Sequence, residues 1–330
     1  MANSIEAALA KINRPVRQRL TKLFGAQKRP FEVYGLLSEF LSIEGKLLRP
    51  ALCTVSCSAV GGKPEDALHA AAAIEMFHNF TLIHDDIEDC SLLRRGKPCM
   101  HMKYGVPLAL NAGDGLFMMV WKEAMELQHP KKEAALQQLL AGFTQVLEGQ
   151  AIELGWYNAK KWDVTEEDYF RVVEGKTGAL IATACEVGGI LGSGSAEQRR
   201  ALSDFGFGIG VGFQIADDVL NIVGDEKKYG KEIGGDILEG KRTLITIRAQ
   251  AMLSGKEKSR LGWLLRKEKK SRRDVSEIIG LLKDSGAVAS AMKTADRRIA
   301  TAKARLKVLP KTPARQVLYE LADYITKREK

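Results

Sequence analysis

Apolar side chains recur along most of the chain at the spacing of one face of an α-helix. Near the start, Leu37, Phe40 and Leu41 show the 3.6-residue period, and the same period returns at the end, from 317 to 325. Short glycine and proline clusters separate these runs, and no linker, low-complexity tract or internal repeat interrupts them. The pattern predicts a single all-α domain of about ten or more helices over residues 1–330.

One segment carries a competing signal. From Phe205 to Phe213, glycine alternates with larger apolar residues, and a period of two is typical of a β-strand. The segment continues without a break into Gln214 and further positions at helical spacing. We therefore predict a buried helix whose glycines let neighbouring elements approach closely.

The composition fits a helical globular protein. Of the 330 residues, 45% are hydrophobic and 28% are charged, with only 7% aromatic residues and 9 prolines. These values exclude a disordered chain, a collagen and a disulfide scaffold. No run reaches the roughly 18 apolar residues of a membrane span, and the N-terminus lacks the apolar core of a signal peptide. The 5 cysteines form no C-x-x-C pair, so we expect reduced thiols in a cytoplasmic protein.

The net charge of +9 is concentrated in one basic segment. Residues 256–273 contain nine Lys or Arg against two Glu, which is a local charge of +7. Nucleic-acid binding needs basic residues interleaved with stacking aromatics, and only Trp263 lies here, so we expect no nucleic-acid partner. We expect a solvated helix face and loop. The alternative is a weak attraction to an anionic membrane surface.

Two acidic clusters follow apolar runs on predicted helices. In the first, Asp85 and Asp89 are four residues apart, so they share a helix face with Cβ atoms about 5–6 Å apart. The second begins at Asp217-Asp218 and reaches Asn221. Carboxylates at this spacing repel one another, and Mg²⁺ held by carboxylates and phosphate oxygens would remove the repulsion. Each cluster alone could be a solvated helix end, but together they predict facing metal sites.

Basic residues flank both acidic clusters. Lys46 and Arg49 precede the first cluster, and residues 94–97 follow it with the sequence Arg-Arg-Gly-Lys. The second cluster is followed by Lys227, Lys228, Lys231, Lys241 and Arg242. Cations around bound Mg²⁺ predict a pocket for a polyanion such as diphosphate, because arginine supplies paired donors and lysine a point charge. The G-x-x-x-x-G-K spacing of residues 235–241 does not indicate a nucleotide loop, since arginine follows it where Ser or Thr is needed.

Taken in order, these motifs resemble the trans-isoprenyl diphosphate synthases, also called polyprenyl synthetases. Residues 45–50 are similar to the family's G-K-x-x-R-P, and residues 85–97 are similar to its D-D-x-x-D motif followed by R-R-G. Further matches are Gly113-Asp114, Gly149-Gln150, Lys176-Thr177-Gly178, Phe213-Gln214 with Asp217-Asp218, and Gly240-Lys241-Arg242-Thr243. Asn221 departs from the family, because Asp is usual at that position, and this leaves its role open.

The resemblance implies a homodimer of isoprenoid-synthase-type helical bundles, each around a deep central cavity. In that cavity an allylic diphosphate would be ionised and joined head-to-tail to isopentenyl diphosphate. By the same resemblance, Asp85 and Asp89 would hold two Mg²⁺ ions and Asp217 a third.

The resemblance also implies which side chains contact each substrate. The allylic diphosphate would contact Arg94, Lys176, Lys231 and Lys241. Isopentenyl diphosphate would contact Lys46, Arg49, His78 and Arg95. Thr177 and Gln214, with the backbone of Lys176, would lie beside the ionising carbon and offer dipoles to the carbocation.

Two rival classes remain open. A class I terpene cyclase also uses D-D-x-x-D, but it needs no isopentenyl diphosphate site, for which residues 45–50 and Arg94-Arg95 argue. A non-catalytic subunit of a heteromeric synthase would be expected to lose an aspartate cluster, whereas both are present.

Product length depends on what lies before the first aspartate motif. On a helix, Thr81 lies about 40° and Phe77 about 80° from Asp85, with Phe77 roughly 12 Å back along the axis, while Phe80 lies about 140° away. Helical geometry favours Phe77 as the floor of the cavity, whereas the family uses the positions of Phe80 and Thr81. An aromatic residue followed by a small one resembles archaeal-type geranylgeranyl synthases and implies a twenty-carbon product. A fifteen-carbon farnesyl product, or plain core packing of both phenylalanines, is the alternative.

Overall fold

A computed structural model describes residues 2–26, 29–42, 45–224 and 233–326. Over these ranges the regular structure is helical except for the two short strands β1 (Leu93–Arg94) and β2 (Lys97–Pro98). The prediction of an all-α fold is therefore confirmed. Lys231, a predicted diphosphate ligand, lies outside the described residues.

Contacts between Cα atoms divide the chain into two compact units, which are described separately. Unit 1 comprises Met1–Phe143, Thr183–Ser203 and Val308–Leu321, and unit 2 comprises Thr144–Ala182, Asp204–Lys307 and Ala322–Lys330. The helices α7 (Lys132–Asn158), α9 (Ala179–Leu191), α10 (Ala196–Val223) and α17 (Pro313–Thr326) and the short η4 (Leu306–Val308) contribute residues to both. The single domain and its central cavity stay predictions.

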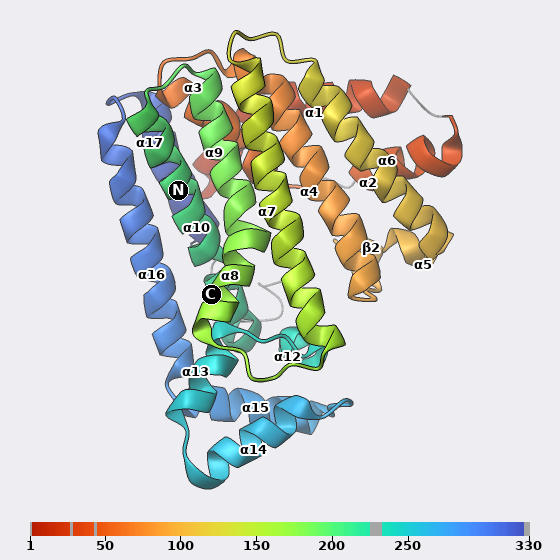
Figure 1. The fold of residues 1–330 in the computed structure, drawn as a ribbon, viewed down its shortest axis with the longest axis vertical. Helices are drawn as coiled ribbons and strands as arrows, with labels where there is room; N and C mark the ends of the chain where they lie inside the picture. Colours follow the sequence, from red (N-terminus) through yellow and green to blue (C-terminus); the bar gives the residue numbers. More distant parts are fainter. Residues whose placement is uncertain (1, 27–28, 43–44, 225–232, 327–330) are drawn as a thin grey trace. The chain divides into compact units, whose positions relative to one another are not determined.

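Unit 1 is organised around α4 (Leu68–Glu88), which packs along α6 (Val106–Met125) (Figure 1). Residues 70–73 of α4 are four alanines, all fully buried, and such small side chains let helices approach closely on more than one side. The other elements are α1 (Ala2–Ala26), η1 (Phe31–Gly35), α2 (Leu36–Leu41), α3 (Leu48–Ala59), η2 (Pro64–Ala67) and α5 (Met100–Tyr104).

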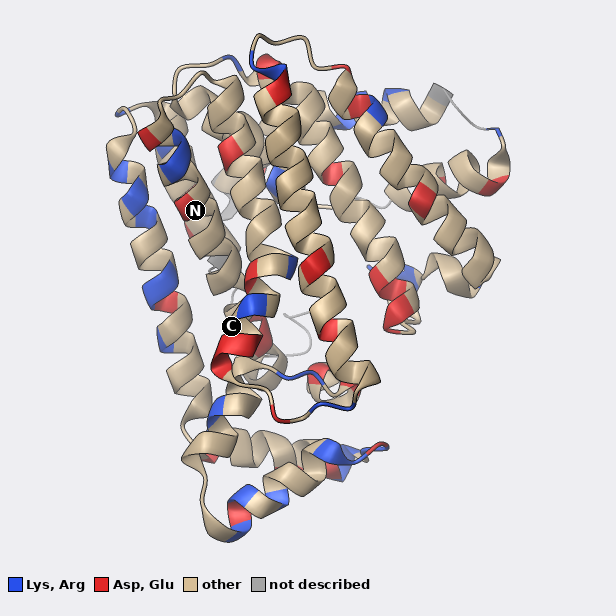
Figure 2. Cartoon of the chain, in the orientation of Figure 1, with Lys and Arg blue, Asp and Glu red and all other residues tan. Residues whose placement is uncertain are grey.

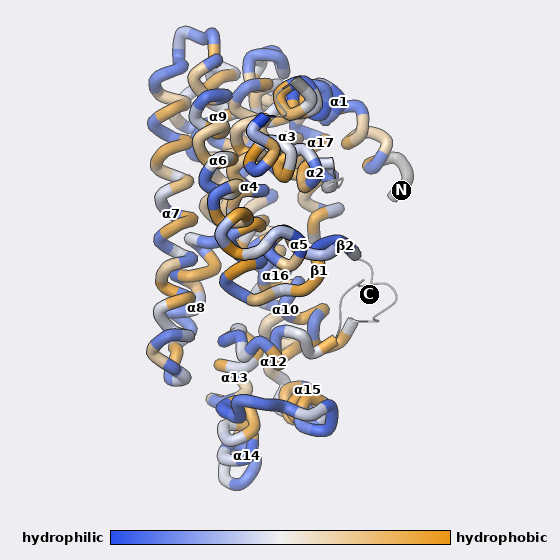
Figure 3. Tube along the Cα trace, turned by 90° about the vertical axis from the view of Figure 1, so that its right-hand side faces the viewer, coloured by the Kyte–Doolittle hydropathy of each residue, from blue (hydrophilic) through white to orange (hydrophobic). Residues whose placement is uncertain are grey.

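Unit 2 contains a second set of helices around its own core. Its elements are α8 (Glu166–Val173), η3 (Glu174–Gly178), α12 (Gly235–Glu239), α13 (Leu244–Met252), α14 (Gly255–Arg266), α15 (Arg272–Asp284) and α16 (Ala287–Arg305). Hydrophobic and hydrophilic stretches alternate along the helices, as Figure 3 shows, which is the pattern of helices with one buried face. The helix starts follow the sequence, because Thr165 and Ser271 each accept a hydrogen bond from the backbone N–H three residues on.

The glycine-alternating segment is helical, as predicted, and forms part of α10. A methyl group on Gly206 would lie 2.6 Å from the carbonyl oxygen of Ile181, and one on Gly210 would lie 3.0 Å from the Cα of Gly178. Gly208, two residues after Gly206, faces a different neighbour, because a methyl group on it would lie 2.7 Å from the Cβ of Ala302 in α16. The glycines thus form two stripes, one for each neighbouring segment, which explains the period of two within a helix.

By length and composition, α10 could also cross a membrane. However, 72% of its most apolar window is buried inside the protein, which is typical of the core helix of a globular fold.

A close approach in unit 1 gives a test of these glycine contacts. A methyl group on Gly188 in α9 would lie 2.1 Å from the carbonyl oxygen of Cys53 in α3, whereas nothing lies within 4 Å of one on Gly155 in α7. We predict that Gly188→Ala lowers the free energy of unfolding by about 1–3 kcal/mol, because backbone must move. Gly155→Ala, the matched control, should raise it by up to about 1 kcal/mol. Urea denaturation measures both, and equal effects would contradict the packing described.

Candidate active site

The first acidic cluster lies at the C-terminal end of α4. Asp85 is in the last turn, and the backbone N–H of Asp89, the C-cap residue, donates to the carbonyl oxygen of Asp85 at 2.8 Å. Figure 2 shows acidic residues gathered at this helix end. Asp85 is half-buried and Asp89 is exposed, so the helical turn presents both carboxylates where solvent has access.

The carboxylates fit magnesium only together with a substrate. Among the described residues, no group of three or more His, Cys, Asp or Glu side chains could hold a metal ion by itself. Mg²⁺ is commonly held by one or two carboxylates, with phosphate oxygens and water completing its six positions. A helical pair such as Asp85 and Asp89 is a donor set of that kind, so the residues present fit a diphosphate-bridged ion.

A tight hairpin follows the first cluster and is fastened to α4. Arg95 and Gly96 form its turn with positive φ angles of 53° and 76°, and Arg94 pairs with Lys97 across it. The Nε of Arg94 donates to Oδ1 of the buried Asp86 at 2.8 Å, and its Nη2 donates to the same oxygen. Burial opposes the charge, but Asp86 outweighs it and raises the pKa of Arg94. The predicted contact of Arg94 with diphosphate therefore stays a prediction beside this observed pairing.

The loop of residues 45–47 is held against α1. The side chain of Asn13 donates to the carbonyl oxygens of Lys46 and Leu47 at 3.3 and 3.0 Å, and Arg17 donates to that of Gly45 at 3.0 Å. Leu47 has a left-handed φ of 48°, which side-chain hydrogen bonds of this kind help to hold. The loop leaves the side chain of Lys46 exposed and places Arg49 in the first turn of α3.

The predicted ligands of isopentenyl diphosphate include His78, whose pKa is lowered by burial and by nearby arginines. Burial, and then the charges of Arg49, Arg95 and Arg94, hold the pKa of His78 well below its usual range, so its ring is neutral at pH 7. Arg95 also lies against the loop, since a methyl group on Gly45 would be 2.9 Å from its Nη2. Unit 1 thus brings Arg49 and Arg95 within electrostatic reach of His78, and their contact with isopentenyl diphosphate stays a prediction.

A buried carboxylate partly balances this positive cluster. Burial raises the pKa of Glu75, while Arg49 is the largest influence that lowers it. Asn79 donates to Oε1 of Glu75 at 3.0 Å. The Nε of Arg49 is buried and has no hydrogen-bond partner among the described residues. Glu75 and Asp86 are fewer than the guanidinium groups of Arg49, Arg94 and Arg95, so an excess of positive charge remains that an anion would neutralise.

In unit 2, Lys176 and Thr177 lie on a π-helical turn, η3. Glycines surround this turn: a methyl group on Gly149 of α7 would lie 2.5 Å from the backbone nitrogen of Lys176. The Nζ of Lys176 is 2.8 Å from Oε2 of Glu153, one helical turn after Gly149. Single π turns inside helices are frequent at functional sites, and this one carries two of the predicted catalytic residues.

The second acidic cluster lies near the end of α10 and is joined to that π turn. The hydroxyl of Thr177 donates to Oε1 of Gln214 at 3.1 Å, and Nε2 of Gln214 donates to Oδ1 of Asp218 at 2.9 Å. The hydroxyl of Tyr169 in α8 donates to Oδ2 of Asp218 at 2.8 Å. Burial, followed by Asp236, raises the pKa of Asp218 to about 7, and the two hydrogen bonds oppose that shift. Asp217, the predicted metal ligand, is half-buried beside this network.

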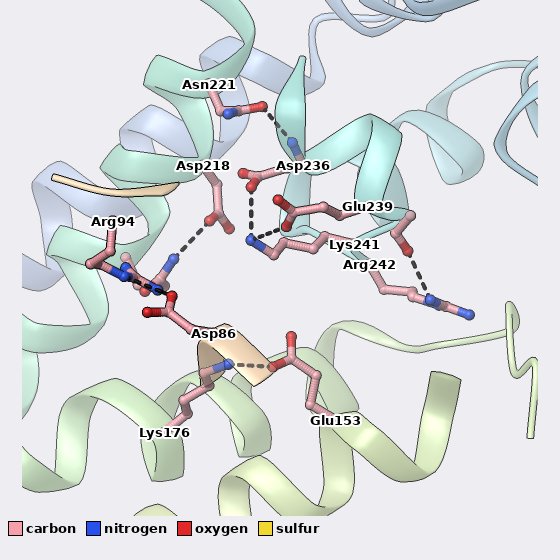
Figure 4. A network of polar contacts seen from close by, with 12 residues as sticks. Asp86, Arg94, Glu153, Lys176, Asp218, Asn221, Asp236, Glu239, Lys241 and Arg242 are labelled. Atoms are coloured by element: carbon pink, nitrogen blue, oxygen red, sulfur yellow. Dashed lines mark hydrogen bonds and ion pairs between the residues drawn. The ribbon is translucent and has the colours of Figure 1, made fainter. Parts of the chain in front are cut away.

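Asn221 has a structural role between α10 and α12. It is buried, its Oδ1 accepts from the backbone N–H of Asp236 at 3.1 Å, and its carbonyl oxygen accepts from Gly234 at 2.8 Å. It therefore fixes the start of α12. Figure 4 shows Lys241 reaching Asp236 and Glu239, at 3.0 and 2.7 Å. Burial disfavours the lysine charge, but both carboxylates outweigh it and raise the pKa of Lys241 well above its ordinary value.

The residue after Lys241 serves the scaffold. Arg242 donates to the carbonyl oxygens of Lys161 and Gly240 at 3.0 and 2.8 Å, and its guanidinium lies 4.2 Å from the ring centre of Trp162. These contacts tie the connection between α7 and α8 to the turn that carries Lys241.

Several charges of the basic segment 256–273 are paired. Arg260 lies 2.7 Å from Glu277, and Lys267 lies 2.7 Å from Asp274. The expected attraction to an anionic membrane surface stays a prediction.

The residues predicted to set product length belong to an aromatic cluster in unit 1. Phe77 is fully buried and stacks on Phe143 of α7, with ring centres 3.8 Å apart and planes 4° apart. Phe80 is 7% exposed and lies 5.1 Å from Phe117 of α6, ring centre to ring centre. Thr81 is half-buried, and its hydroxyl donates to the carbonyl oxygen of His78 at 2.8 Å.

Sequence reasoning missed the residues that hold these side chains in place. They are Asn13, Glu75, Asp86, Phe117, Phe143, Glu153, Tyr169 and Asp236. A signal existed for some of them, because Asp86 lies inside the first motif and Glu153 follows Gly149-Gln150. Tyr169 and Asn13 carry no motif, and only the fold brings them to their partners.

Similar proteins are known over most of the chain. The family model described as Polyprenyl synthetase matches residues 32–282. A short chain isoprenyl diphosphate synthase of Methanothermobacter thermautotrophicus is 41% identical over 286 residues, covering 86% of this chain and 87% of the relative. A geranylfarnesyl diphosphate synthase of Natronomonas pharaonis is 32% identical over 345 residues, covering 99% and 98%.

A solved structure matches over almost the whole chain. The crystal structure of a geranylgeranyl pyrophosphate synthetase from Pyrococcus horikoshii has a TM-score of 0.94 and 37% sequence identity, covering 99% of both chains. The family-model match spans well over half of the chain, and the likeness to the solved structure includes both described units. The chain belongs to the polyprenyl synthetase family.

Proposed function

We propose that this prenyltransferase is a magnesium-dependent, short-chain synthase that joins isopentenyl diphosphate to an allylic diphosphate. The observation that carries the proposal is the excess of positive charge around the neutral His78, from Arg49 and Arg95 in particular. A metal-free diphosphate suits this cluster, because its negative charge balances the guanidinium groups. A terpene cyclase has no use for a second diphosphate site of this kind.

The acidic clusters suit the other substrate. Asp85 and Asp89 of unit 1, and Asp217 of unit 2, would hold Mg²⁺, which would supply positive charge for the allylic diphosphate as it leaves. Lys176 and Lys241 add fixed positive charge in unit 2. Breaking the carbon–oxygen bond leaves its electron pair on diphosphate and a carbocation on the prenyl chain.

The carbocation needs oxygen dipoles and an absence of water. The Thr177 hydroxyl and the Gln214 amide oxygen are held together at 3.1 Å, with Thr177 buried, so they are preorganised to face developing positive charge. The double bond of isopentenyl diphosphate then attacks the cation, forming the new carbon–carbon bond. The proton lost in restoring a double bond passes to the departed diphosphate, so His78 can remain a neutral ligand.

The roles of the acidic cluster are tested by neighbouring substitutions on α4. Asp85→Ala should lower turnover with saturating Mg²⁺ by about a hundredfold or more, since it removes a ligand used where charge develops. Glu88→Ala, an exposed carboxylate of the same helical turn, is the matched control and should change turnover by less than about threefold. Incorporation of labelled isopentenyl diphosphate measures both, and EDTA should abolish it in the unaltered chain. Near-normal turnover of a folded Asp85→Ala variant would contradict the metal role.

We also propose that the main product is the twenty-carbon geranylgeranyl diphosphate. Phe77 of α4 stacks on Phe143 of α7, so it contributes mainly to the packing of these two helices. Phe80 packs against the half-buried Phe117 and directly precedes Thr81 in the sequence. Phe80 is therefore the better candidate for a floor that stops the growing chain.

Product length provides the test of this floor. Phe80→Ala should lengthen the main product by at least one five-carbon unit, because it opens space below Thr81, and Thr81→Phe should shorten it. Phe40→Ala, which truncates another buried phenylalanine of unit 1, is the control and should leave the product length unchanged. Chromatography of the dephosphorylated products measures the outcome. An unchanged distribution in both variants would contradict the floor, and a fifteen-carbon main product of the unaltered chain would contradict the geranylgeranyl proposal.

We further propose a homodimer. Along α6, five large apolar side chains are exposed at 37–66% of their area, namely Val106, Leu108, Leu110, Met118 and Met125. Exposed apolar side chains on one helix favour pairing with a second copy. Sedimentation equilibrium giving the mass of one chain would contradict this.

A further inference from the structure

Tyr169 in α8 begins a continuous chain of hydrogen bonds within unit 2. Its hydroxyl donates to Oδ2 of Asp218 at 2.8 Å, and the other oxygen of Asp218 accepts from Nε2 of Gln214 at 2.9 Å. The amide oxygen of Gln214 in turn accepts from the hydroxyl of Thr177 at 3.1 Å. Four side chains from α8, α10 and η3 are thus connected, and the last two are the predicted carbocation-facing groups.

The order of donors and acceptors gives this chain a direction. A glutamine amide has one accepting end and one donating end, and a rotation by 180° exchanges them. Both oxygens of Asp218 accept in this arrangement, Oδ2 from Tyr169 and Oδ1 from Gln214, so the NH₂ end of Gln214 faces Asp218 and its amide oxygen faces Thr177. With the amide reversed, a partial positive charge would stand where the carbocation needs a negative one.

Burial makes this arrangement rigid. Tyr169, Asp218 and Thr177 are exposed by only 3%, 6% and 8%. Hydrogen bonds in such surroundings are stronger than in water, and an unpaired acceptor is costly. The tyrosine ring is packed in the core of unit 2 with Val211 and Ile215, so the hydroxyl has a fixed position. Burial, and next Asp218, raise the pKa of Tyr169 well above its ordinary value, so the hydroxyl keeps the proton it donates.

We propose that Tyr169 is a positioning residue for prenyl transfer: by holding Asp218 it sets the direction of the Gln214 amide and of the Thr177 hydroxyl. The inference rests on the proposed function, because it assigns those two groups to the carbocation. Tyr169 itself need touch neither substrate. Its removal should therefore slow ionisation without weakening the binding of isopentenyl diphosphate, whose predicted ligands are in unit 1.

The test is a double-mutant cycle on the complete chain with saturating Mg²⁺. Tyr169→Phe removes only the hydroxyl and keeps the ring in the core. It should lower kcat about tenfold, the effect of losing one buried hydrogen bond, with the KM for isopentenyl diphosphate changed by less than about twofold. In a Gln214→Ala background the same substitution should change kcat by less than about twofold, because the group that it positions is gone.

A matched control separates this role from a general loss of structure. Tyr104 of α5 also donates its hydroxyl to a carboxylate, Oε2 of Glu39 at 2.6 Å, but this pair is exposed and lies in unit 1. Tyr104→Phe should leave kcat within about twofold of the unaltered chain. Urea denaturation of every variant checks that the fold is retained.

The outcomes distinguish the inference from the function on which it rests. If Tyr169→Phe matches the unaltered chain, or if its effect is as large in the Gln214→Ala background, the positioning role is wrong while prenyl transfer stands. If the unaltered chain does not incorporate isopentenyl diphosphate with any allylic primer of five, ten or fifteen carbons, the proposed function itself is contradicted.

Discussion

The interaction on which the site depends is repulsion between like charges held close together on a rigid scaffold. In unit 1, the charges of Arg49, Arg95 and Arg94 lower the pKa of His78 in α4. The carboxylates of Asp85 and Asp89 lie at the C-terminal end of the same helix. Asp86 offsets the charge of Arg94, and Glu75 offsets part of that of Arg49. What remains is a positive region and a negative region on adjoining elements, and each is relieved by a different ligand. A diphosphate satisfies the first, and Mg²⁺ carrying a diphosphate satisfies the second.

Rigidity comes from backbones that touch through glycine. In unit 2 the π turn that carries Lys176 and Thr177 is in contact with α7 at Gly149 and with α10 at Gly210. Such contacts leave no space for a side chain, so the turn cannot relax into an ordinary helix without moving its neighbours. The alternating glycines and the hydrogen-bonded chain that connects Tyr169 to Thr177 thus have the same effect. They hold polar atoms in fixed directions inside a core that excludes water.

The sequence predicted what depends on local pattern and on motif. Helical periodicity predicted the all-α fold, and the continuation of the glycine-alternating segment at helical spacing predicted the helix across Phe205–Phe213. Only the resemblance to the family grouped Arg49, His78 and Arg95 as ligands of one substrate. The sequence could not show that Arg94 donates its hydrogen bonds to Asp86, because this contact depends on the register of the hairpin. Nor could it find Tyr169, which lies 49 residues before Asp218 and meets it only in the fold. The π turn also escapes a 3.6-residue period, since its extra residue shifts the pattern by one position.

The central claim is that the two diphosphates are held by different chemistry, one by cations of the protein and the other through metal. Calorimetric titration of the complete chain with isopentenyl diphosphate, and separately with a non-ionisable allylic diphosphate analogue, tests this directly when each is done in Mg²⁺ and in EDTA. Isopentenyl diphosphate should bind with nearly the same affinity in both solutions, because no carboxylate is among its predicted ligands. The allylic analogue should lose its affinity in EDTA. Loss of isopentenyl diphosphate binding in EDTA, or retention of the allylic analogue, would contradict this division.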